Sequence, residues 1–430
     1  MIFSLDVRRA RKGDCLLLHF GSADSPGLVM IDGGPKAVYT PHLRPRLMEI
    51  RAARDLEDHQ PLPVDLLMVS HVDDDHIQGI LDFTKELRNT VGAPFVRVKR
   101  LWHNSFDAII GKDPKELKAG VVASFGPASI EGELPDDATI EVGDDEDPEV
   151  AESTLKVLAS IAQGFRLRLD AEALDIPPNP LFGGKLIMAS NKAVKLPGGV
   201  SFTVAGPMQP ELLKLQKKHD DWLKELKAAG KKPEDALSAF VDKSVPNLSS
   251  LVLLAQAGDK TMLLTGDARG DKILEGLEAI GAIDPGGKLH VDLLKVPHHG
   301  SSNNAAPIFF ERITADHYVF SGDGEHGNPE RETLEMLFDA RGDEPFHLHL
   351  TYPIDETDAG RKKDWEKEQA KEQKRLDNGT SSKAPRENWS AKKHSLASFF
   401  ADHPLGDDQT LEIVPEDEPH VIDLLDELGF

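Results

Sequence analysis

The stretch "LMVSHVDDDHIQGI", residues 67–80, constrains the fold of this chain more than any other. It opens with apolar residues that are typical of a buried strand, and its second half has the apolar spacing of a helix that begins near Asp74 or Asp75. Between the two, two histidines and three aspartates fall within six positions. The stretch therefore predicts a strand-to-helix turn that collects charge at the end of a core strand.

Strand and helix signals alternate along much of the rest of the chain. Apolar strand patterns such as "DCLLLHF", "GLVMIDGG", "SLVLLAQ" and "VDLLKVP" are separated by turn residues or by segments with helical spacing. This alternation predicts an α/β fold, with residues 1–350 forming one domain and a largely helical insertion at about 105–200. Residues 351–430 are predicted to form a charged helix or linker and a C-terminal segment that docks on the body.

Composition limits the function classes. The formal net charge of -24 disfavours a general nucleic-acid or anionic-membrane binder, although it leaves room for a local basic track. Cys15 is the only cysteine, which excludes an intramolecular disulfide and a thiolate-rich zinc cluster. The N-terminus lacks an apolar signal segment, and no apolar run approaches the roughly 18 residues that span a bilayer. These features predict a cytoplasmic protein without a membrane partner.

The charged turn has the chemistry of a metal site. Imidazole nitrogen and carboxylate oxygen together suit divalent zinc, manganese or iron. His71 and Asp73 are two residues apart, so an extended backbone points both the same way, whereas Asp75 and His76 enter the helix and point elsewhere. This spacing suits two adjacent ions. The alternative is an acidic helix-capping turn in which the histidines are incidental.

Four ordered motifs resemble those of the metallo-β-lactamase superfamily, and in particular the hydrolase domain of ComEC-type competence proteins. They are "GDCLLLHF" followed by "VMIDGG", then "HVDDDH", "LLTGDA" and "LLKVPHHGSS". The superfamily signature is H-x-H-x-D-H, and Asp73 replaces its second histidine, as in the ComEC branch. The resemblance runs from residue 1 to about 345, outside the insertion. It implies an αββα sandwich, in which two mixed sheets pack face to face with helices outside.

The resemblance also implies a ligand set for two divalent ions, zinc or manganese. It assigns His71 and Asp73 to the first ion, Asp75 and His76 to the second, Asp267 to both, and His298 or His299 to the second. Independently of the resemblance, a carboxylate such as Asp267 at the end of an apolar strand needs a cation or a cap to compensate its burial. The other histidine of "HHGSS" would contact the substrate or fill the turn.

Two departures from the superfamily pattern affect the site. The strand that matches the third motif ends in "FTVAGP" without the usual histidine, so His103 of "LWHNSFD" is a candidate for the first ion or the substrate, with a structural histidine as the alternative. The segment "GEHGNPERETLEML" resembles a late "GHP" turn, which makes His326 a substrate-side or proton-donating candidate. Asp32 is expected to orient a ligand or hold the glycine turn.

Two ions in such a site lower the pKa of a bridging water and neutralise charge on a phosphorus or carbonyl centre. We therefore expect a metal-dependent hydrolase with Asp75 and His326 as catalytic candidates. Lys295, Ser301 and Ser302 are expected to contact phosphate oxygens, with ordinary surface positions as the alternative. By analogy with the ComEC branch, the first expectation is a phosphodiesterase or nuclease that acts on nucleic acid or a nucleotide.

Two other function classes stay open. The same centre suits a hydrolase of a small carboxylic ester, thioester or lactone. A non-catalytic protein that kept the fold is the third, and the C-terminal segment is then a candidate surface for a protein partner.

Overall fold

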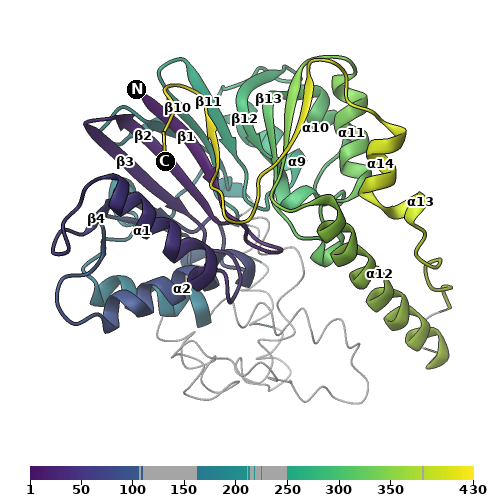
Figure 1. The fold of residues 1–430 in the computed structure, drawn as a ribbon, viewed down its shortest axis with the longest axis horizontal. Coiled ribbons are helices and arrows are strands. Elements are labelled where there is room, and N and C mark those ends of the chain that lie inside the picture. The colour runs from purple at the N-terminus through teal and green to yellow at the C-terminus, as the bar shows by residue number, and fades with distance from the viewer. Residues whose placement is uncertain are drawn as a thin grey trace.

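The fold consists of two β-sheets that pack face to face, with helices on both outer sides (Figure 1). The computed structural model describes residues 1–105, 108–109, 162–210, 212–213, 217, 224, 249–379 and 382–430. Most of the insertion predicted at about 105–200 falls outside these ranges. The layers confirm the predicted α/β class and the αββα sandwich.

The first sheet has six strands in the order β16-β1-β2-β3-β5-β7. Strands β1 to β3 and β16 pair antiparallel, whereas β5 and β7 run parallel to β3. The strands are β1 (Ile2–Val7), β2 (Leu16–Ser22), β3 (Ser25–Ile31), β5 (Leu66–Met68), β7 (Leu101–Trp102) and β16 (His420–Asp423).

The second sheet has eight strands in the order β15-β14-β13-β12-β11-β10-β9-β8. Strands β8 to β11 pair antiparallel, and β11 to β15 run parallel, so the carboxyl ends of β11, β12 and β13 lie at one edge. The strands are β8 (Ser190–Lys195), β9 (Ser201–Gly206), β10 (Val252–Ala257), β11 (Lys260–Leu264), β12 (Leu289–Lys295), β13 (Ile313–Phe320), β14 (Phe346–Leu350) and β15 (Gln409–Ile413).

The outer layers are helical. The longer helices of the described residues are α1 (Arg44–Ala53), α2 (Asp74–Asn89), α9 (Gly270–Ala279), α10 (Pro307–Arg312), α11 (Arg331–Arg341), α12 (Ile354–Asp377) and α14 (Leu396–Asp402). Shorter elements are η1 (Tyr39–Leu43), β4 (Leu62–Val64), β6 (Val96–Val98), η3 (Pro180–Phe182), η5 (Pro297–Gly300), η6 (Glu325–Gly327) and α13 (Ala391–His394). None of the described helices is both long and apolar enough to cross a membrane.

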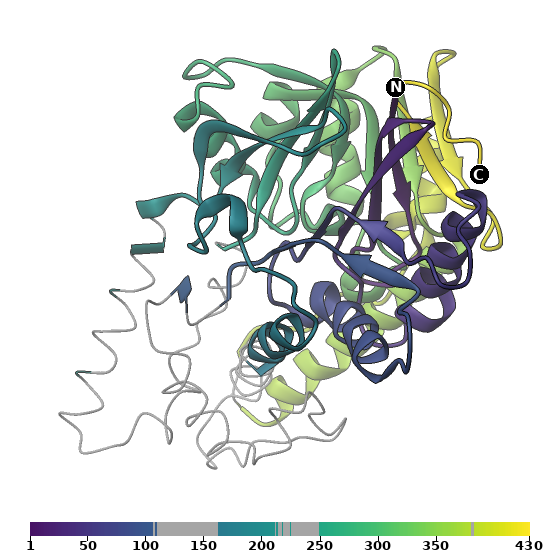
Figure 2. The ribbon, with the colours of Figure 1, turned by 90° about the vertical axis from the view of Figure 1, so that its left-hand side faces the viewer.

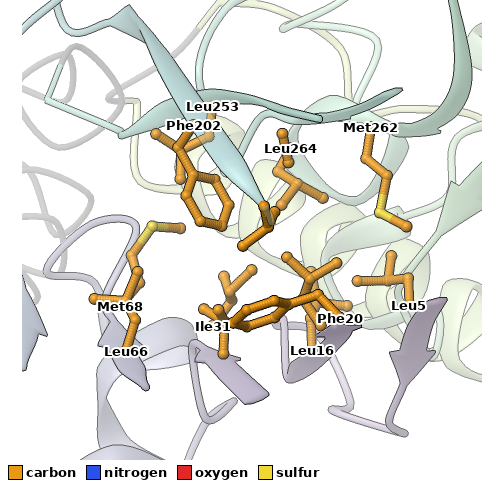
Figure 3. Packing of buried hydrophobic residues seen from close by; sticks show 14 of the residues in the cluster. Leu5, Leu16, Phe20, Ile31, Leu66, Met68, Phe202, Leu253, Met262 and Leu264 are labelled. Atoms are coloured by element: carbon orange, nitrogen blue, oxygen red, sulfur yellow. The ribbon is translucent and has the colours of Figure 1, made fainter. Parts of the chain in front are cut away.

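The central core lies between the two sheets. Figure 3 shows apolar side chains of the first sheet, including Leu16, Phe20 and Ile31, pointing toward Phe202 and Leu264 of the second sheet. The two-residue period of a strand explains the sequence of β2, because Leu16 faces this core while Leu17 faces the layer of α1 and α2. Because β2 is covered on both faces, apolar residues occupy successive positions along it.

The C-terminal segment belongs to both sheets. Strand β15 pairs parallel with β14, and β16 pairs antiparallel with β1, so the chain after residue 350 supplies one edge strand to each sheet. The terminal ammonium of Met1 forms an ion pair with Asp426, and the two termini lie near each other in Figures 1 and 2. The first part of the segment predicted as a charged helix or linker forms the helix α12.

Candidate metal centre

Histidine and carboxylate side chains from several strand ends meet at one edge of the sandwich. They follow β5, begin α2, or follow β11 and β12, and every one has a nitrogen or oxygen within 4.0 Å of another member. The set comprises His71, Asp73, Asp75, His76, Asp267, His298 and His299. The structure therefore brings together all the side chains that the sequence predicted as metal ligands.

Asp267 lies at the centre of this group, and its side chain is only 3% exposed. Its Oδ1 lies 3.2 Å from Nε2 of His76 and 3.4 Å from Nε2 of His299. Its Oδ2 lies 3.4 Å from Nε2 of His298 and 3.8 Å from Nε2 of His71. One carboxylate thus faces two pairs of imidazole nitrogens, each pair on a different oxygen.

Hydrogen bonds fix which ring nitrogen faces Asp267. Nδ1 of His76 lies 2.8 Å from Oδ2 of Asp32, and an ionised carboxylate only accepts, so His76 donates there and its Nε2 faces Asp267. Nδ1 of His298 lies 2.8 Å from Oδ1 of Asn304, which donates from Nδ2 to the carbonyl of Asp267. Asp32 therefore orients a ligand candidate, as predicted.

The group fits a divalent cation. Nε2 of His71, His76 and His299 and Oδ1 of Asp267 are buried without a hydrogen-bond partner among the described residues. Buried polar atoms without partners are costly, and bound cations would satisfy them. The side chains form two possible ligand sets, and within each set the ligand atoms lie within 4.8 Å of one another. One set is Asp14, His76, Asp267 and His299, and the other is His71, Asp75 and His76. Nitrogen and oxygen donors of this kind suit zinc or manganese.

Close backbone packing brings the ligands together. A Cβ on Gly79 of α2 would lie 1.9 Å from the carbonyl oxygen of Gly33, so only glycine allows the helix to reach the turn that carries Asp32. In η5, His298 and His299 have φ values of 47° and 56°, in the left-handed region that non-glycine residues seldom adopt. Such strain is typical of functional sites and costs about 1–3 kcal/mol per residue.

The charges of the group support each other. Burial lowers the pKa of His76, but Asp267 and Asp32 outweigh burial and hold that pKa well above its usual value. Burial raises the pKa of Asp267, but His298, His76 and His299 outweigh it and hold that pKa well below its usual value. The central carboxyl is consequently ionised, which is the form that binds a metal.

Several predicted substrate residues lie elsewhere than expected. Lys295 is 1% exposed and its Nζ lies 2.6 Å from Oδ2 of Asp14, so the prediction that it contacts a substrate phosphate is wrong. Ser301 and Ser302 both donate to the carboxylate of Glu330, at 3.3 and 2.5 Å. These two serines follow His299 after Gly300, but they already have an acceptor.

His103 and His326 lie outside both sets of ligand atoms. His103 is buried, its ring nitrogens have no hydrogen-bond partner among the described residues, and burial, followed by Arg168, lowers its pKa to about 3. It is thus not among the side chains that the structure groups as ligands. His326 is exposed on η6, where it lines a cavity of about 410 Å³ together with Glu330 and Trp365.

The sequence did not reveal the side chains that support the ligands. Asp14, Asn304 and Ser321 are all buried at loop positions next to the centre, and Ser70 donates to Asp32. Asp14 had a usable signal, because it is a carboxylate directly before a core strand, as Asp32 is directly after one. Small polar residues such as Ser321 carry no comparable signal.

Comparisons with known proteins give partial likenesses, and no family model matches the chain. Microtubule-associated protein 1A of Rattus norvegicus is 29% identical over 150 residues, which are 34% of this chain and 5% of that protein. The human protein of the same name is 32% identical over 93 residues, which are 21% of this chain and 3% of that protein. The chain thus spans only a small part of these curated relatives.

Two solved structures overlap with more of the chain. A protein from Parabacteroides distasonis that is described as a metal-dependent hydrolase shares 9% identity, with a TM-score of 0.30, over 81% of this chain and 98% of that one. A metallo-β-lactamase variant from Cronobacter sakazakii shares 12% identity, with a TM-score of 0.24, over 65% of this chain and 70% of that one. At these values, the arrangement of the chain's own side chains is the stronger guide to function.

Proposed function

We propose that this protein is a metal-dependent hydrolase. The observation that carries the proposal is the position of Asp267, whose two carboxylate oxygens face the Nε2 atoms of four histidines, three of which have no hydrogen-bond partner among the described residues. Divalent ions in such a site would supply Lewis acidity and a water of lowered pKa. His71 and Asp73 would hold one ion, Asp75, His76 and His299 the other, and Asp267 would contact both.

The chain's own residues define the open side of the centre. The side chains of Asp73, Asp75 and His298 are 31%, 19% and 29% exposed, whereas those of His71 and His76 are fully buried. A substrate would therefore approach over Asp73, Asp75 and His298. Asp75 is the proposed catalytic residue because it is both a ligand candidate and exposed on this side.

The cavity lined by His326 is the proposed substrate side of the site. Glu330 lines it and accepts hydrogen bonds from Ser301 and Ser302, which follow the ligand candidate His299 after one glycine. His326 can donate a proton to a group bound in this cavity. A volume of about 410 Å³ matches a small organic molecule or one or two nucleotides.

A phosphodiester is the proposed substrate class. Three aspartates among the ligands make the centre rich in oxygen, which suits the hard cations that serve phosphoryl transfer. Lys295 is unavailable for phosphate binding because it is buried against Asp14. A small uncharged ester is the second candidate, because the cavity has the size of a small molecule and its lining combines acidic side chains such as Glu330 with basic ones such as Arg331.

The test compares substrates on one preparation. The protein is stripped with a chelator, reloaded with manganese or zinc, and assayed on single-stranded DNA, duplex DNA, RNA, a chromogenic phosphodiester and a neutral ester over a salt series. The proposal predicts phosphodiester turnover that the chelator abolishes and the metal restores. Nucleic-acid cleavage should fall steeply as salt rises, because phosphate contacts are ionic. Turnover of the neutral ester alone would favour the second candidate, and no turnover of any substrate would favour the non-catalytic class.

A further inference from the structure

A chain of four buried side chains leads from the core to the candidate metal centre. Nζ of Lys295 lies 2.6 Å from Oδ2 of Asp14, Ser321 donates to Oδ1 of Asp14, and Nδ1 of His299 lies 2.9 Å from Oγ of Ser321. The four residues are 1 to 2% exposed. Asp14 lies just before β2, and Lys295 is the last residue of β12. His299 lies in η5, and Ser321 directly follows β13.

The proton positions along this chain follow from what each group can do. An ionised Asp14 only accepts, so the hydroxyl proton of Ser321 points to Asp14. The oxygen of Ser321 is then an acceptor for His299, which must carry its proton on Nδ1. The lone pair of Nε2 is left facing Oδ1 of Asp267 at 3.4 Å, where Nε2 has no hydrogen-bond partner among the described residues.

Lys295 is the origin of this order. A buried carboxylate needs a cation or hydrogen-bond donors to compensate its charge, and Nζ of Lys295 at 2.6 Å supplies that cation. The ion pair keeps Asp14 an acceptor. Asp14 also lies close enough to His76, Asp267 and His299 to be a possible metal ligand itself. Its Oδ2, however, is already paired with Lys295.

We propose that Lys295, Asp14 and Ser321 are positioning residues that hold His299 as its Nδ1–H tautomer and present Nε2 to a metal ion. The inference rests on the proposed metal centre. It parallels the arrangement at His76, where the carboxylate of Asp32 accepts from Nδ1 directly. The two central histidines are thus oriented by two different carboxylates: Asp32 contacts His76 directly, whereas Asp14 holds His299 through Ser321 and also lies 3.4 Å from its Nδ1.

The test measures the tautomer and the metal affinity separately. Nitrogen-15 NMR of the histidine rings in the metal-free protein should show His299 as the Nδ1–H form, with a His299→Gln variant used to assign the signal. Ser321→Ala should mix the tautomers and weaken manganese or zinc binding about 10-fold or more in calorimetry. Ser321→Thr keeps the hydroxyl and should restore both. Ser4→Ala, a buried serine on β1 far from the ligands in sequence, is the matched control and should change neither.

A second variant removes the start of the chain without leaving a buried charge. The double replacement Asp14→Leu with Lys295→Met should weaken metal binding as Ser321→Ala does. If the wild-type protein binds metal and both variants bind it equally tightly, with the tautomer unchanged, the positioning role is wrong while the hydrolase proposal stands. If the wild-type protein binds no metal, the proposed function fails, and the NMR comparison still decides whether this chain sets the tautomer.

Discussion

Two histidine clusters in this protein have opposite chemistry. At the candidate metal centre, His71, His76, His298 and His299 surround the carboxylate of Asp267. The second cluster lies on β13, β14 and β16 and consists of His317, His347, His349 and His420. Nε2 of His349 lies 3.0 Å from Nδ1 of His317, and Nδ1 of His349 lies 2.9 Å from Nε2 of His420. These three rings therefore form a chain of hydrogen bonds.

The difference shows that the carboxylate, and not the number of histidines, makes a cation site. Burial lowers the pKa of His317 and His420 to about 4, because the acids near them do not compensate it. At the metal centre, Asp267 and Asp32 overcome burial and raise the pKa of His76. The first cluster therefore has the electrostatics to hold a cation, whereas the second is a neutral chain of imidazoles that joins the two sheets.

The largest effect is expected from Asp267→Asn. Neutralising the one side chain that faces all four histidines should abolish detectable metal binding and lower hydrolysis by at least about 100-fold. Calorimetry and the phosphodiester assay measure the two effects. Asp292→Asn, which removes a carboxylate that pairs with Lys260 on the same sheet, is the matched control and should keep both properties. Normal metal binding by the Asp267 variant would contradict the comparison.

The next largest effect concerns single ligands on α2. Asp75→Ala or His76→Ala should each reduce hydrolysis by about 100-fold or more, because each removes a ligand at the rim of the strands. The melting temperature of the metal-free protein should change little in the Asp75 variant, because that side chain is partly exposed, and should fall in the His76 variant, which loses a hydrogen bond to the buried Asp32. Full activity in either variant would show that the turn only caps the helix.

Lowering the pH should reveal the second cluster. The pKa values of His317 and His420 are below the unfolded value of about 6.5, so between pH 6.5 and pH 4 the unfolded chain binds more protons. Stability contributed by these neutral rings is present above pH 6.5 and should be lost as pH falls to 4. The loss is about 3 kcal/mol for the pair, with allowance for the partial exposure of His317.

Chemical denaturation at pH 7 and pH 4.5 measures this loss. A His317→Gln, His420→Gln variant should show a smaller difference between the two pH values than the wild-type protein does. An equal difference in both proteins would mean that the lowered pKa values of this cluster do not govern acid stability.

The smallest effect is expected when a histidine of the second cluster is replaced and the metal affinity is measured. His349→Gln removes the central ring of that chain but no ligand candidate, so the metal affinity should stay within about twofold of the wild-type value. Calorimetry with manganese is the measurement. A large loss would mean that the second cluster also binds the ion or is coupled to the centre.

The α/β class could be predicted because strand and helix patterns lie close together in the chain, whereas the αββα layers and the full ligand set came from the resemblance to the metallo-β-lactamase superfamily. Apolar strands followed by charged turns placed His71, Asp75 and Asp267 at strand ends, and parallel strands bring such ends to one edge. Strands β15 and β16 were harder to predict. Their short, polar sequences resemble amphipathic segments, and only pairing with β14 and β1 makes them strands.

The supporting residues could not be predicted because their partners are distant in sequence. Lysine is seldom fully buried, so Lys295 was expected at the surface, and only its contact with Asp14 explains its burial. In the same way, Asn304 becomes informative only when it is seen between His298 and the backbone of Asp267.

Metal analysis of the purified protein tests the central claim most directly. After mild dialysis, elemental analysis should find at least one equivalent of a divalent metal per chain, and adding manganese or zinc to stripped protein should raise the total toward two and raise the melting temperature. The Asp267→Asn variant should retain none. A wild-type protein that holds no metal, and whose melting temperature does not respond to manganese or zinc, would contradict the account.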